Sequence, residues 1–290
     1  MRILAISNQK GGVGKTTTSV NLGAALAERG HQVLLVDLDP QGNASTHVGV
    51  DIYRIEKSIY EVLTNGTTLS QILLPTGLPT LWCAPSNIDL SSAEIEMVSA
   101  VGREIILKEA LARLAKDRAE AGLPALDFVI IDCPPSLGLL SINALSAAHE
   151  VLVPLQTEFF ALQGMSKLME VVGIVQHRIN PELRLAGIIA CRMDTRTRLA
   201  SEVLSEIENH FPELLYATRI RQNVKLAEAP SHGQTIIEYD SESKGSEDYR
   251  RLAAEFLGLP FEHDEEVEET EDAEASPETP VEISEADGRA

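Results

Sequence analysis

A glycine-rich segment with two lysines lies near the beginning of the chain and has the residue types that phosphate binding requires. Residues 9–17 read Gln-Lys-Gly-Gly-Val-Gly-Lys-Thr-Thr, directly after the apolar run RILAIS and before a helical pattern. Glycines let backbone amides curl around a phosphate without Cβ clashes, and the N-terminus of the following helix adds a positive dipole end. Lys15 would place a charge beside the β- and γ-phosphates, and the Thr16 hydroxyl would bind Mg²⁺. The alternative is a turn that only joins a strand to a helix, which would not require the Gly-Lys-Thr order.

Two acidic segments stand at the ends of predicted strands. Residues 36–42 read Val-Asp-Leu-Asp-Pro-Gln-Gly, and residues 130–136 read Ile-Ile-Asp-Cys-Pro-Pro-Ser. Ligands of open parallel sheets bind beyond the carboxyl ends of the strands, so Asp37, Asp39 and Asp132 are expected near the glycine-rich loop. Phosphoryl transfer needs a metal ion that neutralises charge and a group that orients the attacking water. Each aspartate alone could be a strand-end cap, but beside a phosphate loop the three indicate a hydrolytic nucleotide site.

The elements that must position these residues alternate between short apolar runs and longer helical patterns. Strands are predicted over RILAIS, QVLLVDL, FVIID, EVLVPL and RLAGIIAC, and the first helix over Thr16 to Arg29. The runs are apolar on both faces, as is typical of central strands in a parallel sheet. The sequence therefore predicts an α/β fold, a P-loop NTPase with a mostly parallel central sheet flanked by helices, in a single domain. Residues 50–125 are interpreted as a helical excursion between strands, with Ser86 to Leu114 its most helix-rich part.

The charge of the chain is unevenly distributed. Of the formal net charge of −20, residues 262–290 carry −12, because they hold thirteen acidic residues and one basic residue. This segment has almost no aromatic or large apolar side chains, so it is expected to be a disordered acidic tail behind an ATPase domain of residues 1–261. A net acidic body argues against a protein that coats nucleic acid through its overall charge, but a local basic patch stays possible.

The cysteines and the hydropathy indicate the compartment. Cys83, Cys133 and Cys191 are odd in number, far apart and without a CxxC pair, which fits reduced thiols better than a disulfide framework or a zinc site. No apolar run approaches the ~18 residues that a membrane-spanning helix needs. We therefore expect a soluble cytoplasmic protein that lacks an export signal and does not insert stably into a membrane.

Lys10 makes the loop unusual, because a lysine ahead of the glycines is not needed to hold phosphate within one subunit. The pattern K-G-G-x-G-K-T-T is the deviant Walker A sequence, and the chain resembles the ParA/Soj-type chromosome-partitioning ATPases of the MinD/ParA superfamily. The resemblance covers nearly all of residues 1–261 and includes DLDPQGNAS, DCPPS, EFFALQGMSKL, RMDTRTRLASEV and NVKLAEAPSHGQTIIEYDSESKGSEDYRRLAAEF. A solvated surface lysine is the alternative interpretation of Lys10.

The resemblance implies a role for each residue of the site, with ATP and Mg²⁺ as cofactors. Lys10 would reach the partner's phosphates across an ATP-sandwich homodimer, Asp39 would position the attacking water with Asp37 in support, and Thr16 and Asp132 would hold the metal. The nucleotide-binding set would be Lys10, Gly11, Gly12, Val13, Gly14, Lys15, Thr16, Thr17 and Asn223, with Lys10, Lys15 and Asp39 catalytic. The chain has Arg221-Gln222-Asn223 where the family usually has Pro-Arg-Asn, and Asn223 still matches the adenine contact.

The resemblance also implies a Mg²⁺-dependent ATPase that segregates DNA of a chromosome or plasmid. The ATP dimer would bind DNA non-specifically on the nucleoid, and a ParB-type centromere-binding partner would stimulate hydrolysis and release. Two basic clusters agree with this, since Arg192, Arg196 and Arg198 are opposed locally only by Asp194 and Arg219, Arg221 and Lys225 have no acid between them. Such clusters suit phosphate-backbone binding without base readout, and an ordinary solvated face is the alternative. The DNA-contact candidates are Arg196, Arg221 and Lys225.

Two related classes of protein with different functions are alternatives to a partitioning ATPase. A MinD-like ATPase that cycles on the membrane and regulates the cell-division site needs a C-terminal amphipathic helix with basic residues, whereas this chain ends in acidic residues. An iron–sulfur reductase or metal-inserting relative needs paired cysteines near the strand-end aspartates, whereas Cys133 stands alone in DCPPS. The MinD-like ATPase is the principal alternative.

Overall fold

A computed structural model describes residues 1–157, 161–193 and 198–260 of the chain. They form an α/β domain around an eight-stranded sheet with the order β3-β4-β2-β5-β1-β6-β7-β8. Only β3 is antiparallel, and each of the other neighbouring pairs is parallel. The strands are β1 Arg2–Ile6, β2 Val33–Asp37, β3 Leu74–Pro75, β4 Leu81–Ala84, β5 Phe128–Asp132, β6 Glu150–Gln156, β7 Arg184–Met193 and β8 Leu215–Arg221. The predicted fold class, an α/β P-loop protein with a mostly parallel sheet, is therefore confirmed.

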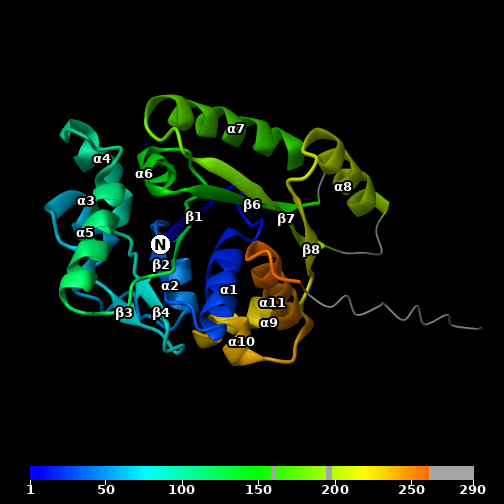
Figure 1. Cartoon of the computed structure of the whole chain (residues 1–290), viewed down its shortest axis with the longest axis horizontal. Coiled ribbons are helices and arrows are strands. Elements are labelled where there is room, and N and C mark those ends of the chain that lie inside the picture. The colour runs from blue at the N-terminus through cyan, green and yellow to red at the C-terminus, as the bar shows by residue number, and fades with distance from the viewer. Residues whose placement is uncertain (158–160, 194–197, 261–290) are drawn as a thin grey trace, which may run out of the picture. The chain divides into compact units, whose positions relative to one another are not determined.

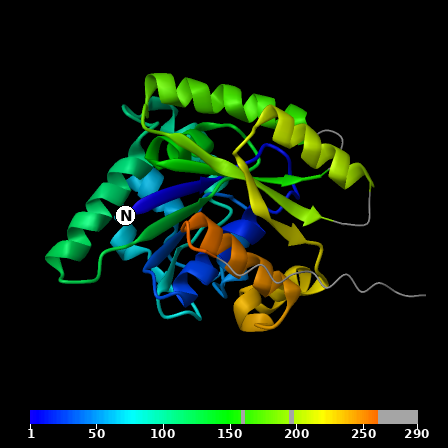
Figure 2. The same ribbon diagram turned by 45° about the vertical axis from the view of Figure 1, so that its right-hand side comes forward.

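Helices cover both faces of this sheet (Figures 1 and 2). One layer contains α3 Ile59–Asn65, α4 Leu90–Glu96, α5 Ile106–Glu120, α6 Leu139–Ala147, α7 Ala161–Arg178 and α8 Arg198–His210. The other contains α1 Lys15–Glu28, α2 Asn43–His47, α9 Val224–Glu228, α10 Ile236–Tyr239 and α11 Lys244–Phe256. Short 3₁₀ helices lie at Leu69–Gln71, Met97–Ser99 and Ala229–His232.

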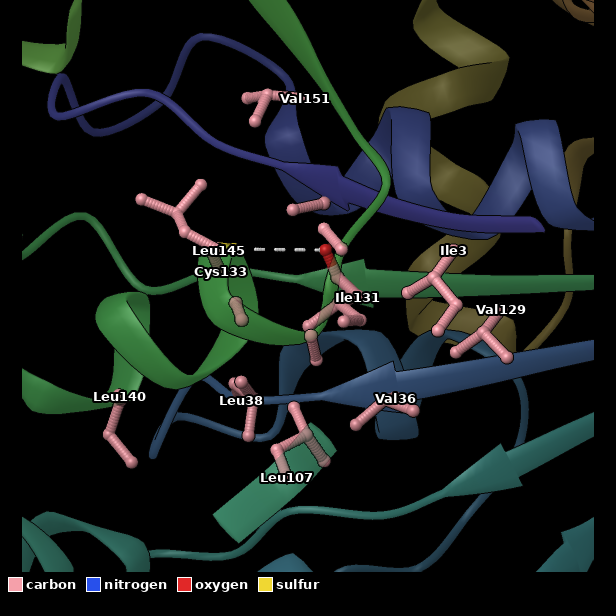
Figure 3. Close-up of a cluster of buried hydrophobic side chains, with 14 of the residues drawn as sticks. Ile3, Val36, Leu38, Leu107, Val129, Ile131, Cys133, Leu140, Leu145 and Val151 are labelled. Atoms are coloured by element: carbon pink, nitrogen blue, oxygen red, sulfur yellow. Dashed lines mark hydrogen bonds between the residues drawn. The ribbon is translucent and has the colours of Figure 1, made fainter. Parts of the chain in front are cut away.

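Alternating strand residues supply the two apolar cores. Ile3, Val36 and Ile131 face the first layer, and they belong to the apolar cluster of Figure 3, which also contains Leu107 and Leu140. Their immediate neighbours along each strand, Leu4, Leu35 and Ile130, face the second layer. Because both faces are buried, the central strands contain continuous apolar runs that end in polar residues, and these runs are recognisable in the sequence.

Three strands, β3, β4 and β8, were not predicted. Residues 50–125 were interpreted as a helical excursion, but β3 and β4 lie within them, and β4 pairs with β2 as part of the main sheet. The run Leu81–Ala84 is only four residues long, so its pattern does not separate a strand from a helix turn. The strand β8 was also missed, because its partly exposed sequence LYATRIR mixes basic and apolar residues.

Three further expectations concern the domain boundary, membrane-spanning helices and the cysteines. The α/β domain runs to Pro260, and the acidic segment 262–290 lies outside the described residues, so a domain boundary at residue 261 stays a prediction. None of the helices within the described ranges is long and apolar enough to cross a membrane. Cys83, Cys133 and Cys191 are all buried free thiols, as the sequence led us to expect.

Candidate nucleotide site

The glycine-rich loop joins β1 to α1 near the centre of the sheet. The strands β2 to β5 lie on one side of β1 and the strands β6 to β8 on the other. Gly12 and Gly14 have φ angles of 75° and 96°, a left-handed backbone that disfavours residues with a Cβ. Gly14 is the N-cap of α1, and its carbonyl accepts a hydrogen bond from the Thr18 amide at 2.8 Å. The loop therefore ends on the N-terminus of a helix, which is a favourable place for an anion.

Lys15 is buried at the first position of α1, with 7% of its surface exposed. Its Nζ donates to the carbonyl oxygen of Lys10 at 3.2 Å, so the side chain folds back along the loop. Burial lowers the pKa of Lys15, while the nearby carboxylates of Asp132 and Asp39 act in the opposite direction. Lys15, Asp39 and Asp132 therefore lie close enough to influence one another electrostatically.

Asp132 ends β5, the strand next to β1, and is fully buried. Its Oδ2 accepts from the Thr16 hydroxyl at 2.8 Å, and its Oδ1 accepts from the Ser19 hydroxyl at 2.7 Å. Burial, with a further contribution from Asp37, raises the pKa of Asp132 to about 7. The Thr16 hydroxyl and a carboxylate beside a phosphate loop fit Mg²⁺, which takes few protein oxygens and completes its shell with phosphate and water. Ser19 was not predicted, since only the folded helix brings it to Asp132.

Asp37, the last residue of β2, and Asp39, two residues later, occupy different environments. Asp37 is fully buried: its Oδ2 accepts from the amide and hydroxyl of Ser45 at 2.8 and 2.7 Å, and its Oδ1 accepts from the Asp39 amide at 3.1 Å. Burial raises the pKa of Asp37 to about 6. Asp39 is partly exposed, accepts from the Gln41 amide at 3.0 Å and lines the cavity described below. Asp37 thus holds the turn that contains Asp39, and its supporting role in hydrolysis stays a prediction.

A cavity of about 570 Å³ opens over the loop. Its lining comes from the glycine-rich loop, the segments after β2 and β5, the ends of β7 and β8, α9 and α11. The lining residues are Gly11, Gly12, Gly14, Lys15, Thr16, Thr17, Asp39, Asn43, Pro135, Cys191, Arg192, Ile220, Arg221, Gln222, Asn223, Val224, Leu226, Ala227 and Tyr249. The volume suits a nucleotide-sized ligand. Cys191, Arg192 and Tyr249 were not among the predicted site residues.

Asn223 also lines this cavity. It is the N-cap of α9, where its Oδ1 accepts from the Lys225 amide at 2.8 Å. Thus the predicted adenine contact and the predicted phosphate loop line one cavity, although more than 200 residues separate them in the sequence. Of the remaining loop residues, Val13 is buried and Lys10 is partly exposed, with its amide donating to Asn8 Oδ1 at 3.0 Å.

The three predicted DNA contacts have different surroundings. Arg221 holds Asp248 and Glu247 through Nη2 at 2.6 and 2.8 Å, and its own amide also donates to Asp248. Lys225 pairs with Glu228 at 3.5 Å and lies 5.5 Å from the centre of the Tyr239 ring. Arg196 lies outside the described residues. Because two carboxylates already hold Arg221, it offers less charge to DNA than its residue type suggests.

These features together define a P-loop nucleotide-binding protein. They are the parallel sheet, the glycine-rich loop on a helix N-terminus, the buried lysine and the Thr16–Asp132 pair. Residues 1–185 match a family model described as an AAA domain. The chain is 47% identical over 254 residues to the sporulation initiation inhibitor protein Soj of Bacillus subtilis, covering 88% of this chain and 97% of Soj. It is 44% identical over 256 residues to the chromosome partitioning protein ParA of Myxococcus xanthus, covering 88% of each. The chain belongs to the ParA/Soj family of chromosome-partitioning ATPases.

A solved structure supports the same fold and a nucleotide in the family. The cobyrinic acid a,c-diamide synthase of Mycobacterium smegmatis, with bound ADP and magnesium, superposes with a TM-score of 0.76 at 40% sequence identity. The match covers 89% of this chain and 94% of the other. A nucleotide and Mg²⁺ therefore occur together in a close structural relative.

Proposed function

We propose that this protein is a Mg²⁺-dependent ATPase that segregates DNA by switching between an ATP-bound dimer and a released form. The observation that carries the proposal is the Thr16–Asp132 hydrogen bond of 2.8 Å beside the buried Lys15, at the floor of a nucleotide-sized cavity. Around this pair stand a helix N-terminus for the phosphates and Asp39 on the cavity wall. Family membership directs the ligand choice to ATP.

In the proposed chemistry the protein holds the phosphates and orients a water. Lys15 leaves the Lys10 carbonyl to contact the β- and γ-phosphates, and the loop amides bind their oxygens. Thr16 and Asp132 hold Mg²⁺, which neutralises charge on the phosphates. Asp39 accepts a hydrogen bond from the attacking water, while Asp37 keeps the Asp39 turn in place. Asn223 binds the adenine in the same cavity.

The proposed dimer and cargo extend this site to other molecules. Lys10 reaches the phosphates of the partner subunit, so that ATP joins two copies of the chain. The dimer binds DNA through its phosphate backbone, with the Arg196 segment and Lys225 as the main contacts and Arg221 as a weaker one. A ParB-type centromere-binding protein stimulates hydrolysis and so releases the dimer. The relatives named for chromosome partitioning support these partners.

The dimer proposal has a direct test in sedimentation velocity with ATP, ADP or no nucleotide. The wild-type chain is expected to dimerise only with ATP and Mg²⁺. Lys10→Ala should remain monomeric with ATP while it still binds the nucleotide, because Lys15 and the loop amides are intact. Exposed Lys108→Ala, on α5, is the matched control and should dimerise normally. An ATP dimer of normal affinity in the Lys10 variant would overturn the cross-subunit role.

A further inference from the structure

Arg192, near the end of β7, has an unusual backbone. Its φ angle is 53°, in the left-handed region that residues with a Cβ rarely adopt. The pairing of β7 with β8 shifts register at this place, between Ala190 and Met193. Such bulges occur next to active sites, where they redirect a side chain that regular pairing would point elsewhere. The local irregularity therefore marks Arg192 as a residue whose direction matters.

The side chain of Arg192 reaches the phosphate loop. Its Nη1 donates to the carbonyl oxygen of Gly12 at 3.3 Å, across a sequence separation of 180 residues. Arg192 also lines the same cavity as Lys15 and Asn223. The guanidinium thus stands at the rim of the loop that receives the phosphates, on the side formed by β7.

The chemistry of this position favours an anionic ligand. A guanidinium presents five N–H donors in a planar fork that matches phosphate oxygens, and its hydrogen bonds to anions are stronger than those to a neutral carbonyl. Of the other two cations that line the cavity, Arg221 is already paired with Glu247 and Asp248, whereas Lys15 donates to a loop carbonyl, that of Lys10. Arg192 and Lys15 can therefore each exchange a backbone oxygen for a phosphate oxygen when nucleotide enters.

We propose that Arg192 binds the phosphate chain of the nucleotide, as a second cation beside Lys15. The proposal rests on the proposed ATP site and adds a residue to it. It also gives Arg192 a role different from the DNA contact that the basic sequence cluster with Arg196 and Arg198 suggested: Arg192 is exposed, but it lines the cavity and contacts the loop.

The test compares Arg192→Met with Arg192→Lys in the full-length chain, using calorimetric titration with ATP, tripolyphosphate and adenosine. Loss of one charged hydrogen-bonding group should weaken ATP and tripolyphosphate binding by about tenfold to a hundredfold in the Met variant. The Lys variant should recover part of that affinity, because it restores the charge without the planar fork. Adenosine binding should not change. Arg184→Met, at the opposite end of β7, is the matched control and should bind all three ligands normally.

The thermal unfolding midpoint without ligand completes the test. If Arg192 contacts phosphate, the Met variant should unfold near the wild-type temperature when empty and gain less stability from ATP. Unchanged ATP and tripolyphosphate affinity would overturn the proposal, as would an equal loss for adenosine with a lower midpoint, which would show that Arg192 only braces the loop. Loss of DNA binding at saturating ATP with normal nucleotide affinity would also overturn it. If the wild-type chain bound tripolyphosphate but not ATP, the proposed function would be contradicted. The tripolyphosphate affinities of the wild type and the Met variant would still decide the role of Arg192.

Discussion

At the residue scale, Lys15 and Asp39 should fail in different ways when each is replaced by alanine. Lys15→Ala removes the buried countercharge for the phosphates, so ATP affinity should fall by about tenfold to a hundredfold. Asp39→Ala should bind ATP but lose turnover by about 10²-fold or more, because no group orients the water. Equilibrium binding and phosphate release, measured on both variants, separate the two effects. Full turnover in Asp39→Ala would contradict its assigned role.

His47 gives a pH prediction at the same scale. The imidazole is buried at the end of α2, Nε2 has no hydrogen-bond partner within the described part of the chain, and burial lowers its pKa to about 4. Below pH 6.5 the unfolded chain binds a proton that the folded chain excludes, so stability is lost as the pH falls from about 6.5 to 4. The loss attributable to this group is at most about 3 kcal/mol.

The test is urea unfolding of His47→Gln at pH 7.5 and pH 5. The variant should lose less stability on acidification than the wild type, whatever its offset at pH 7.5. The same substitution at exposed His177 is the control. Parallel pH dependence in His47→Gln and the wild type would show that the buried imidazole does not exclude the proton.

The sequence alone was sufficient for the residues that a local pattern marks. Lys15 and Thr16 follow from the Gly-Lys-Thr order, and Asp39 and Asp132 from their places at strand ends, and the structure brings all four to one site. Ser19 and Arg192 could not be found in this way. Ser19 meets Asp132 only because α1 packs beside β5, and Arg192 meets Gly12 only through a bulge that no local pattern announces.

At the element scale, α11 ties two parts of the site together. Asp248 accepts hydrogen bonds from the amide and the guanidinium of Arg221, at the end of β8, where the turn to Asn223 begins. The next residue, Tyr249, places its hydroxyl 3.2 Å from that of Thr18 on the phosphate-binding helix. Figures 1 and 2 show α11 lying beside α1. The phosphate-loop helix and the segment with the proposed adenine contact therefore share one support.

Asp248→Asn should weaken this support and, with it, the segment with the proposed adenine contact. Because Asp248 is nearly buried and Arg221 is a third exposed, unfolding free energy should fall by about 1–3 kcal/mol, less than for a fully buried pair. ATP affinity should fall more than tripolyphosphate affinity. Glu247→Gln removes the more exposed partner of Arg221 and should cost less than about 1 kcal/mol. Equal losses in the two variants would show that the buried carboxylate has no special role.

The strands of the sheet differ in how readily the sequence predicts them. The central strands β1, β2, β5, β6 and β7 are recognisable because both of their faces are buried and each contains a continuous apolar run. The strands β4 and β8 lie toward the edges of the sheet and are short or partly exposed, so their patterns are ambiguous. A sequence pattern detects burial on two faces more readily than strand pairing itself.

At the scale of the whole molecule, the acidic segment 262–290 should be separable from the ATPase. Its composition offers little apolar surface to bury, so its deletion should leave the unfolding temperature and the ATPase rate nearly unchanged. DNA affinity should stay the same or rise, since thirteen acidic residues compete with DNA phosphates for the basic residues. Calorimetric unfolding and DNA titration of the truncated chain check both statements. A clearly lower unfolding temperature would mean that the segment packs on the domain.

The central proposal for the whole molecule is that ATP binding makes the domain form a dimer that binds DNA. The most direct test is sedimentation of the full-length protein with DNA of unrelated sequences, in ATP, in ADP and without nucleotide, with Lys10→Ala in parallel. The wild type should sediment with every DNA in ATP only, more weakly as salt increases because phosphate binding releases counterions. Lys10→Ala should not sediment with DNA under any of the three conditions. Equal DNA binding in ATP and ADP, or normal binding by Lys10→Ala, would contradict the claim.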